Sequence, residues 1–462
     1  MVFKLVLFLA IPVYAYFITP EDLSLLEILD PAEQFIFGIA NLGILQAFYR
    51  YFSRFETAAE KTDVASSIFW FTLLSAALWS IVFLVFAPYI VPVLLPDHPL
   101  AWLCFYLTVA SLILRLVNII PQGFLILNEQ AFKQSWLQVS GGVLFVGFLS
   151  VAIIFFDRNI EAAFIGRLFL FIPLIVVGLY HVLPYIRFRF NPGLLKSMLL
   201  FSLPFVLSAA AYPILNHFDR WLLSTLIDAR NTGIYGMSYR FGMIPGMLLV
   251  TPFLKAWRPF IYNYDDEETQ RTVYRRVMLY YTLLGCLLWL GLSVFSEEII
   301  RIFTAEDYYP GHVIIPYIAG SQFFYGLGWI LFAGLAVKEK SLFIGVMTMA
   351  GAILNIVLNL LLIPVYGMTG AAIATLISFF VMFLGYAIYV QFNLPLNWPY
   401  ARFVLMMAIS LIAFFVTTLI ELEPLWADLV LNAAICIVTA LLLVYSTGVP
   451  IKQIISFLKS KK

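Results

Sequence analysis

Four arginines and one aspartate stand inside long apolar segments of the sequence. Asp219 and Arg220 are neighbours in "PILNHFDRWLLSTLIDARNTGIYGMSYRFG", and Arg115, Arg167 and Arg240 lie in similar segments. A charge in mid-bilayer costs about 2.5–3.5 kcal/mol, so these side chains should face a cavity or one another. The planar guanidinium fork binds two oxygens of a phosphate. Four positive charges and one negative charge predict a cavity of net charge +3 that suits an anionic substrate.

Arg115 is followed by Asn118 and Gln122 on nearly the same helix face, and we expect both to extend the anion site. Asp219 and Arg220 point about 100° apart on a helix, which predicts two separate roles in place of one salt bridge. Asp219 is then a candidate ion ligand and Arg220 a candidate phosphate contact. In the alternative interpretation Asp219 pairs with Arg167 or Arg240 and only holds the helices together.

A second polar group lies in "AGAILNIVLNLLLIPVYGMTGAAIATLIS". Asn355 and Asn359 are spaced i and i+4 and so share one helix face, while Thr375 and the carbonyl of Ala371 follow in the next apolar segment. With Asp219, these oxygens form a candidate site for a small hard cation such as Na⁺. The alternative is ordinary hydrogen bonding between helices, which is common for Asn in membranes.

The elements that carry these residues are transmembrane helices. The chain has 462 residues, is 63% hydrophobic and 11% charged, and has a mean hydropathy of +0.97, which predicts an all-α polytopic membrane protein. About 20 apolar residues cross a bilayer. We expect fourteen spans, at 1–18, 32–52, 65–88, 99–121, 136–156, 161–183, 197–227, 233–254, 277–296, 312–337, 341–364, 369–391, 402–420 and 427–448.

The distribution of Lys and Arg predicts the orientation. With fourteen spans and both termini cytoplasmic, 20 of the 27 basic residues fall inside and three (Arg158, Arg230 and Arg301) outside. The acidic stretches, "TPEDLSLLEILDPAE" among them, then fall in outer loops. The first segment could be a signal peptide, but an even helix count favours a short first transmembrane helix. Because no soluble residues precede this segment, we expect the start of the sequence to be trimmed. The basic amphipathic tail 451–462 is expected on the inner membrane surface or as an ordinary basic terminus.

An internal repeat predicts the domain organisation. "DRNIEAAFIGRL" aligns with "YGMTGAAIATLI", and "LNEQAF" with "VKEKSL", both at an offset of about 210 residues. Six spans separate the copies, which predicts an N-terminal lobe at 1–190, a C-terminal lobe at 191–395 and two extra helices at 396–450. Pro204 and Pro213, and the run "GMIPGML", are expected to break the seventh and eighth helices.

Catalytic motifs are not found in the sequence. The four histidines are scattered, and neither a phosphate-binding P-loop nor an HExxH motif is present. A membrane glycosyltransferase would need large outer loops with catalytic acids, although Glu21 and Asp22 leave that alternative open. We therefore expect a protein that is not an enzyme and needs no cofactor beyond Na⁺ or H⁺ as a coupling ion.

Three stretches resemble the signatures of polysaccharide flippases. They are "LSLLEIL…FGIANLGILQAFYRYF", "LPFVLSAAAYPILNHFDRWLLSTLIDARNTGIYGMSYRFG" and "AGAILNIVLNLLLIPVYGMTGAAIATLIS". Together they are similar to the Wzx-like branch of the multidrug/oligosaccharidyl-lipid/polysaccharide exporter superfamily. The resemblance implies two six-helix lobes with two extra helices, alternating access, and a basic cavity to which Arg240, and also Arg115 and Arg167, would contribute. It also implies a cation site at Asp219, Asn355, Asn359 and Thr375, with Asn359 standing where relatives can carry a carboxylate.

The resemblance implies a flippase in a bacterial inner membrane. Its substrate would be an undecaprenyl-pyrophosphate-linked oligosaccharide, moved from the inner to the outer leaflet, and polysaccharide polymerases or assembly proteins would be its partners. A cation-coupled multidrug exporter of the same fold and a non-transporting scaffold for envelope assembly are the alternatives. The scaffold predicts that the cavity charges are dispensable.

Overall fold

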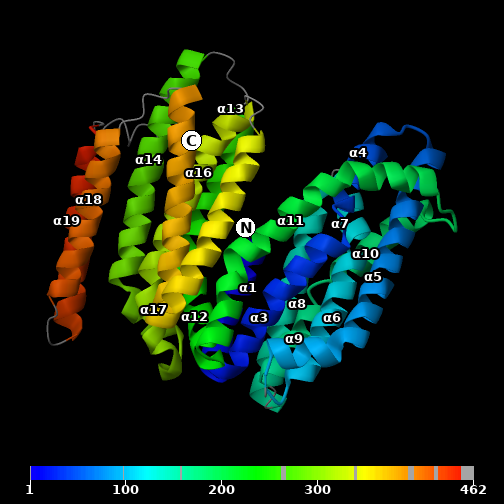
Figure 1. The fold of residues 1–462 in the computed structure, drawn as a ribbon, viewed down its shortest axis with the longest axis horizontal. Coiled ribbons are helices and arrows are strands. Elements are labelled where there is room, and N and C mark those ends of the chain that lie inside the picture. The colour runs from blue at the N-terminus through cyan, green and yellow to red at the C-terminus, as the bar shows by residue number, and fades with distance from the viewer. Residues whose placement is uncertain are drawn as a thin grey trace. The chain divides into compact units, whose positions relative to one another are not determined.

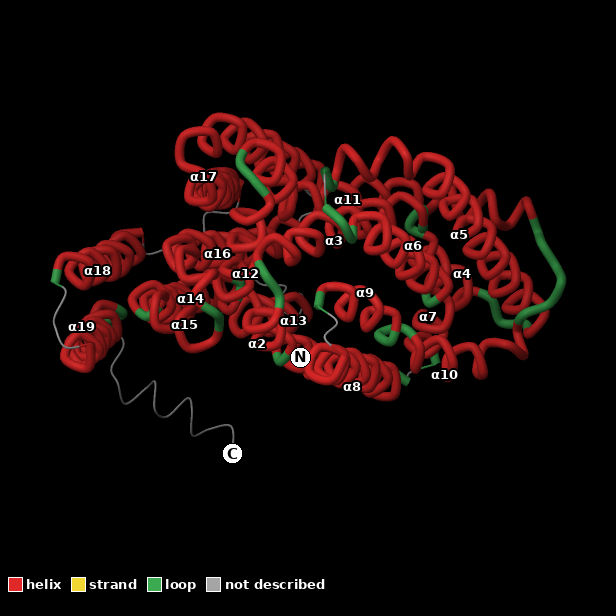
Figure 2. The backbone as a smooth tube through the Cα atoms, turned by 90° about the horizontal axis from the view of Figure 1, so that it is seen from below, coloured by secondary structure: helices red, strands yellow, loops and turns green. Residues whose placement is uncertain are grey.

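The computed structural model describes residues 2–96, 98–128, 130–156, 159–261, 267–337, 341–393, 400–420 and 425–448. These residues form helices joined by short connections, without a strand among them (Figures 1 and 2). The chain divides into two compact units, Met1–Gly236 and Met237–Lys462. The predicted lobe boundary at residue 190 stays a prediction, and the basic tail 451–462 lies outside the described residues.

The first unit consists of the helices from α1 to α11 and the beginning of α12. Their bounds are α1 (Val2–Phe8), α2 (Ala10–Phe17), α3 (Pro20–Ala40), α4 (Ile44–Arg54), α5 (Ala58–Leu94), α6 (Ala101–Val117), α7 (Ile119–Leu127), α8 (Ala131–Phe156), α9 (Ile160–Leu168), α10 (Ile172–Val182), η1 (Leu183–Tyr185), α11 (Pro192–Leu226) and α12 (Ala229–Gly242).

The second unit begins within α12 and contains the remaining helices. These are η2 (Gly246–Val250), α13 (Thr251–Ile261), α14 (Glu267–Val294), α15 (Ser296–Phe303), η3 (Glu306–Ile314), α16 (Ile315–Val337), α17 (Ser341–Asn393), α18 (Tyr400–Leu419) and α19 (Leu425–Ser446). Of these, η2 is a π-helix and η3 a 3₁₀-helix.

The described residues include nine helices that are long and apolar enough to cross a membrane, or ten if α3 and α4 form one span bent by 43°. The prediction of an all-α polytopic membrane protein is confirmed, whereas the count of fourteen stays a prediction. One of the nine, α17, has 53 residues, far more than the ~20 that a bilayer requires. Its backbone is non-helical at Gly367, between the spans predicted at 341–364 and 369–391.

The prediction for the second span was wrong at its beginning. We expected a span at 32–52 preceded by an acidic outer loop, but α3 begins at Pro20. Thr19 caps the helix by accepting a hydrogen bond from the Asp22 amide, and Pro20 occupies the first turn with two acidic residues, an arrangement that favours helix initiation. The acidic stretch is therefore helical, and the helix ends where Leu42 and Gly43 adopt positive φ angles.

Prolines act differently in the two helices that were expected to break. The long α11 continues from Pro192 to Leu226 through both internal prolines, so Pro204 and Pro213 do not end it. By contrast, α12 ends at Gly242, and a π-helical turn begins at Gly246 immediately after Pro245. The break expected at "GMIPGML" is thus present in the structure, since proline removes a backbone donor there.

Close packing of α12 on α3 requires glycine. A Cβ atom added at Gly236 would collide with the Glu27 carboxyl group. We expect Gly236→Ala to lower the thermal unfolding temperature of the purified protein by several degrees, because Glu27 would be pushed from its place. The matched control is Gly147→Ala in α8, where an added Cβ meets nothing within 4 Å. Its free energy of unfolding should differ from that of the wild type by no more than about 0.5 kcal/mol. Equal melting of the two variants would contradict this packing.

Candidate functional site

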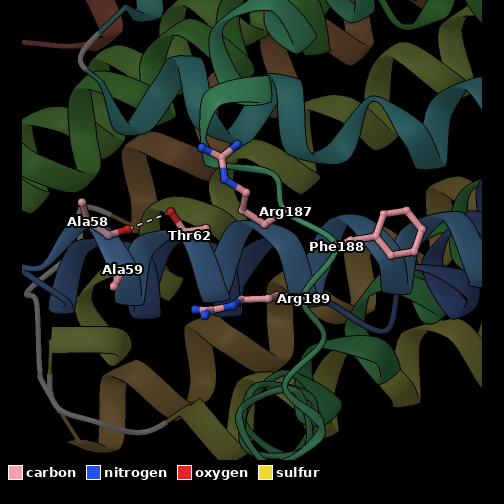
Figure 3. Close-up of a pocket in the computed structure, with 6 residues that line it drawn as sticks. All are labelled: Ala58, Ala59, Thr62, Arg187, Phe188 and Arg189. Carbon is pink, nitrogen blue, oxygen red and sulfur yellow. Dashed lines mark hydrogen bonds between the residues drawn. The ribbon is translucent and has the colours of Figure 1, made fainter.

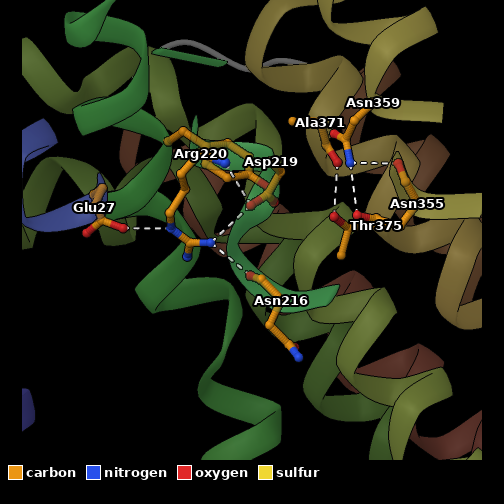
Figure 4. A network of polar contacts seen from close by, with 9 residues as sticks. Glu27, Asn216, Asp219, Arg220, Asn355, Asn359, Ala371 and Thr375 are labelled. Carbon is orange, nitrogen blue, oxygen red and sulfur yellow. Dashed lines mark hydrogen bonds and ion pairs between the residues drawn. The ribbon is translucent and has the colours of Figure 1, made fainter. Parts of the chain in front are cut away.

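Arg220 on α11 is the centre of a buried ionic network in the first unit (Figure 4). Its Nε donates to Glu27 Oε2 on α3 over 2.7 Å, and the two side chains are only 4% and 7% exposed. Its Nη1 donates to the Asn216 carbonyl at 2.9 Å and to Asp219 Oδ1 at 3.2 Å. One guanidinium thus joins two carboxylates on different helices.

The expectation that Asp219 and Arg220 do not form a salt bridge was wrong. The angle of about 100° separates the Cβ directions, but the Arg220 side chain is long enough to turn back along its own helix to Asn216 and Asp219. The second Asp219 oxygen accepts from the Tyr235 hydroxyl of α12 at 2.6 Å. Both oxygens of Asp219 are therefore hydrogen-bonded, and the alternative pairing of Asp219 with Arg167 is not found.

A second network surrounds Glu33, which lies between two of the predicted arginines. Arg167 Nη2 of α9 donates to Glu33 Oε2 at 2.8 Å and its Nη1 to Asp30. Arg115 Nη1 of α6 is 3.6 Å from Glu33 Oε1, which also accepts from the Ser111 hydroxyl at 3.3 Å. Arg115 is 32% exposed, whereas Arg167 is 14% and Glu33 only 1% exposed. Of the three predicted arginines in this unit, Arg115 is therefore the most accessible.

The predicted net charge of +3 left out three acids on α3 that pair with the predicted arginines. In the first unit Arg115, Arg167 and Arg220 face four carboxylates, because α3 contributes three that were assigned to an outer loop. With all seven groups ionised, three positive and four negative charges leave −1, a sum that does not include Arg240 of the second unit. Burial explains the pairing, since an unpaired buried charge costs several kcal/mol.

The sequence carried two signals for the missed acids on α3. Glu27, Asp30 and Glu33 repeat every three residues, the spacing that puts side chains on one helix face. The preceding Thr-Pro-Glu-Asp is a helix-start pattern. Both indicate a helix that places three acids together against the arginine-bearing helices.

The other predicted contacts of the substrate lie in different places. Asn118 caps α6 three residues after Arg115, is 8% exposed, and its Oδ1 has no hydrogen-bond partner. Gln122 is half-buried in α7. Arg240 lies in the last turn of α12, in the part assigned to the second unit. The roles of these residues in substrate binding stay predictions.

The predicted oxygen cluster lies on the two arms of α17, which pack antiparallel. A Cβ at Gly370 would meet the backbone of Leu362, and one at Gly385 would meet Met347. Because one arm reverses the direction of the other, Asn359 lies opposite the stretch between Ala371 and Thr375. The structure thus brings together the four predicted residues that belong to this unit.

Hydrogen bonds already occupy part of this oxygen cluster (Figure 4). Asn359 Nδ2 donates to the carbonyl and to Oδ1 of Asn355 at 2.8 and 3.0 Å, and the Thr375 hydroxyl donates to the Ala371 carbonyl at 3.1 Å. Asn359 Oδ1 is buried without a donor, which suits a cation ligand. The cluster offers only neutral oxygens, and the part of Asp219 in completing it stays a prediction. Among the described residues, no group of three or more His, Cys, Asp or Glu could hold a metal ion.

A separate shallow pocket lies at one end of α5, outside every predicted site (Figure 3). It has a volume of about 480 Å³ and is lined by Arg187, Arg189 and Thr62 among others. Phe188 is 95% exposed, and Arg189 is 3.8 Å from Asp63. Exposed charges of this kind are weakly coupled, so this pocket contrasts with the buried networks above.

Comparison with known proteins places the chain in a family. The family model described as "Polysaccharide biosynthesis protein" matches residues 4–311, more than half of the chain. A Shigella flexneri protein named as an O-antigen transporter is 23% identical over 350 residues, which cover 73% of this chain and 82% of that protein. A Haloferax volcanii protein named as a low-salt glycan biosynthesis flippase is 22% identical over 187 residues, 40% of this chain and 39% of that one.

Solved structures confirm the fold. The lipid II flippase MurJ in an inward closed conformation has a TM-score of 0.78 at 19% identity, with 96% of both chains covered. An inward-facing multidrug resistance MATE transporter has a TM-score of 0.73 at 14% identity, covering 84% of this chain and 94% of that one. These relatives are transporters and flippases, which confirms the prediction that the chain is not an enzyme. The chain belongs to the polysaccharide biosynthesis protein family.

Proposed function

We propose that the chain is a flippase for lipid-linked glycans in a bacterial inner membrane. Its substrate is an oligosaccharide on undecaprenyl pyrophosphate, carried from the inner to the outer leaflet by alternating access, with both termini cytoplasmic. The family match and the names of the two relatives, an O-antigen transporter and a glycan biosynthesis flippase, support this proposal. Polysaccharide polymerases or other assembly proteins would take over the product.

The observation that carries the proposal is the Glu33 network. Arg115 has the longest contact to Glu33, at 3.6 Å, and the most exposed side chain of the three arginines. A pyrophosphate that enters the bundle can therefore take the place of Glu33 at Arg115, while Arg167 keeps Asp30. Exchange of one anion for another avoids leaving a buried guanidinium unpaired. When the substrate leaves, the Glu33 carboxylate pairs with Arg115 again.

Coupling to Na⁺ or H⁺ is the second part of the proposal. The α17 residues Asn355, Asn359, Ala371 and Thr375 would hold a cation through neutral oxygens, with Asp219 as the charged ligand or proton acceptor. Because Arg220 and Tyr235 already donate to Asp219, an ion competes with these donors. That competition would give the ion a different affinity for two conformations, which is the condition for shifting their equilibrium.

The test is a flipping assay in liposomes with a labelled polyprenyl-pyrophosphate sugar. We expect Arg240→Ala and Asp219→Asn, at equal protein content, each to lower the initial rate at least about tenfold, the value of one charged hydrogen bond. Full flipping by both variants would refute the predicted roles of Arg240 in substrate binding and of Asp219 in transport. A rate that ignores imposed Na⁺ and H⁺ gradients would remove the coupling while leaving the substrate assignment intact.

Transport of cationic drugs is a second candidate function, favoured by one observation. In the two buried networks of the first unit, four carboxylates face three arginines, an excess of one acid that suits a positive ligand. Efflux of a fluorescent cationic dye from the same liposomes separates the two functions. We expect the dye to remain inside the liposomes and the glycan lipid to be flipped between the leaflets.

A further inference from the structure

The second unit contains a pocket that none of the proposed transport steps uses. Its volume is about 1920 Å³, and it is lined by α14, α16, α17, α18 and α19. The walls are mostly apolar and include Trp289, Phe324, Phe380, Met407 and Phe414. Sites for drug-sized molecules are usually about 300–1,000 Å³, so this pocket has room for a ligand with long hydrocarbon chains.

One end of the pocket is polar. The lining there comes from Glu297, Glu298 and Arg301 on α15, which follows the end of α14, and from Asp428 and Asn432 near the beginning of α19. The apolar lining lies farther along the same helices, for example at Cys286 on α14 and Met407 on α18. The pocket is thus amphipathic from end to end, like a lipid.

Two buried acceptors at the polar end lack a donor. Asn432 is 5% exposed and donates through Nδ2 to Asp428 Oδ2 at 2.8 Å, but its Oδ1 has no hydrogen-bond partner. Glu298 Oε2 is also buried without one. Buried polar atoms in proteins are nearly always paired, and leaving one unpaired costs free energy. A ligand that supplies N–H or O–H donors would satisfy both atoms.

The charges at this end select a cation. Three carboxylates stand against Arg301, whose Nη2 pairs with Glu297 Oε1 at 2.7 Å. Burial, together with the negative charges of Glu297 and Asp428, raises the pKa of the Glu298 carboxyl, and the opposing effect of Arg301 is too small to reverse the direction. A pyrophosphate headgroup carries only negative charge and would be repelled, whereas an ammonium group supplies both the charge and three N–H donors.

We propose that this pocket binds a membrane phospholipid with a primary-ammonium headgroup, the ammonium at Glu298 and Asn432 and the acyl chains along the aromatic walls. Arg301 then lies beside the lipid phosphate. The lipid occupies the pocket as a bound component of the membrane protein and is distinct from the transported glycan lipid.

Native mass spectrometry of the purified full-length chain tests this assignment. Dioleoyl phosphatidylethanolamine and dioleoyl phosphatidylglycerol, which share acyl chains, are titrated separately. We expect the ethanolamine lipid to bind at least about tenfold more tightly, and Glu298→Gln to remove that preference. Glu306→Gln, an exposed acid outside the pocket lining, should retain it.

A second variant addresses the apolar part. Met407→Trp should fill the wall and weaken binding of the ethanolamine lipid while Glu298 and Asn432 remain. Equal affinity for the two lipids, an unchanged preference in Glu298→Gln, or displacement of the ethanolamine lipid by polyprenyl phosphate at equal concentration would each overturn the proposal. Because Gln is nearly isosteric with Glu, loss of the fold does not confuse the result.

Discussion

Arg220→Ala is expected to destabilise the protein by about 3–5 kcal/mol, because it leaves two buried carboxylates without their cation. Glu27 and Asp219 are 7% and 3% exposed, and Arg220 is the charged group that contacts both. Differential scanning fluorimetry of the detergent-purified protein, together with the yield of monodisperse material, measures the effect. Transport should fall in parallel, since α3 and α11 lose the bond that joins them.

The matched control is Arg230→Ala. Arg230 also bonds to an acid of α3, with Nη1 at 3.1 Å from Glu21 Oε1 in the first turn, but these side chains are 47% and 45% exposed. An exposed pair contributes about 0–1 kcal/mol. Arg220→Leu combined with Glu27→Gln should recover part of the lost stability by removing one of the stranded charges. If Arg220→Ala melts like Arg230→Ala, the buried network has no structural role.

Arg115→Ala is expected to abolish most transport at nearly unchanged stability, whereas Arg167→Ala should lower both the transport rate and the stability. Arg167 is 14% exposed and bonds to Asp30 and Glu33, so its removal strands two acids. Arg115 has one long contact of 3.6 Å and is 32% exposed. Its removal leaves Glu33 paired with Arg167, so no carboxylate loses its only cation. The expected fall in the initial flipping rate for Arg115→Ala is about 10- to 100-fold, the value of a hydrogen bond to a charged group.

Two further variants sharpen this comparison. Arg115→Lys keeps the charge but loses the planar fork, so an intermediate rate is expected. Arg189→Ala removes an arginine that is 71% exposed, and it should change neither the rate nor the melting temperature. A wild-type flipping rate in Arg115→Ala would show that the substrate does not replace Glu33 there.

The membrane class and the residues that matter could be predicted from the sequence. Apolar runs have the length that a bilayer demands, and charges inside such runs are too costly to be incidental. Arg115, Arg167, Arg220 and Asp219 were found in this way, and each lies in a buried or half-buried ion pair. The i, i+4 pairing of Asn355 and Asn359 likewise follows from helix periodicity alone.

Only the tertiary structure decided which charges meet. Glu27 and Arg220 are separated by 193 residues, and Glu33 and Arg167 by 134. The composition of α3 favoured a loop, because acids interrupt its apolar run. Hydropathy is a local property and does not show that arginines on other helices pair with these acids. The sequence determined that the buried arginines require anions. The packing of α3 against α6, α9 and α11 decided that the protein's own carboxylates supply them, since a buried charge takes whichever opposite charge the fold brings within reach.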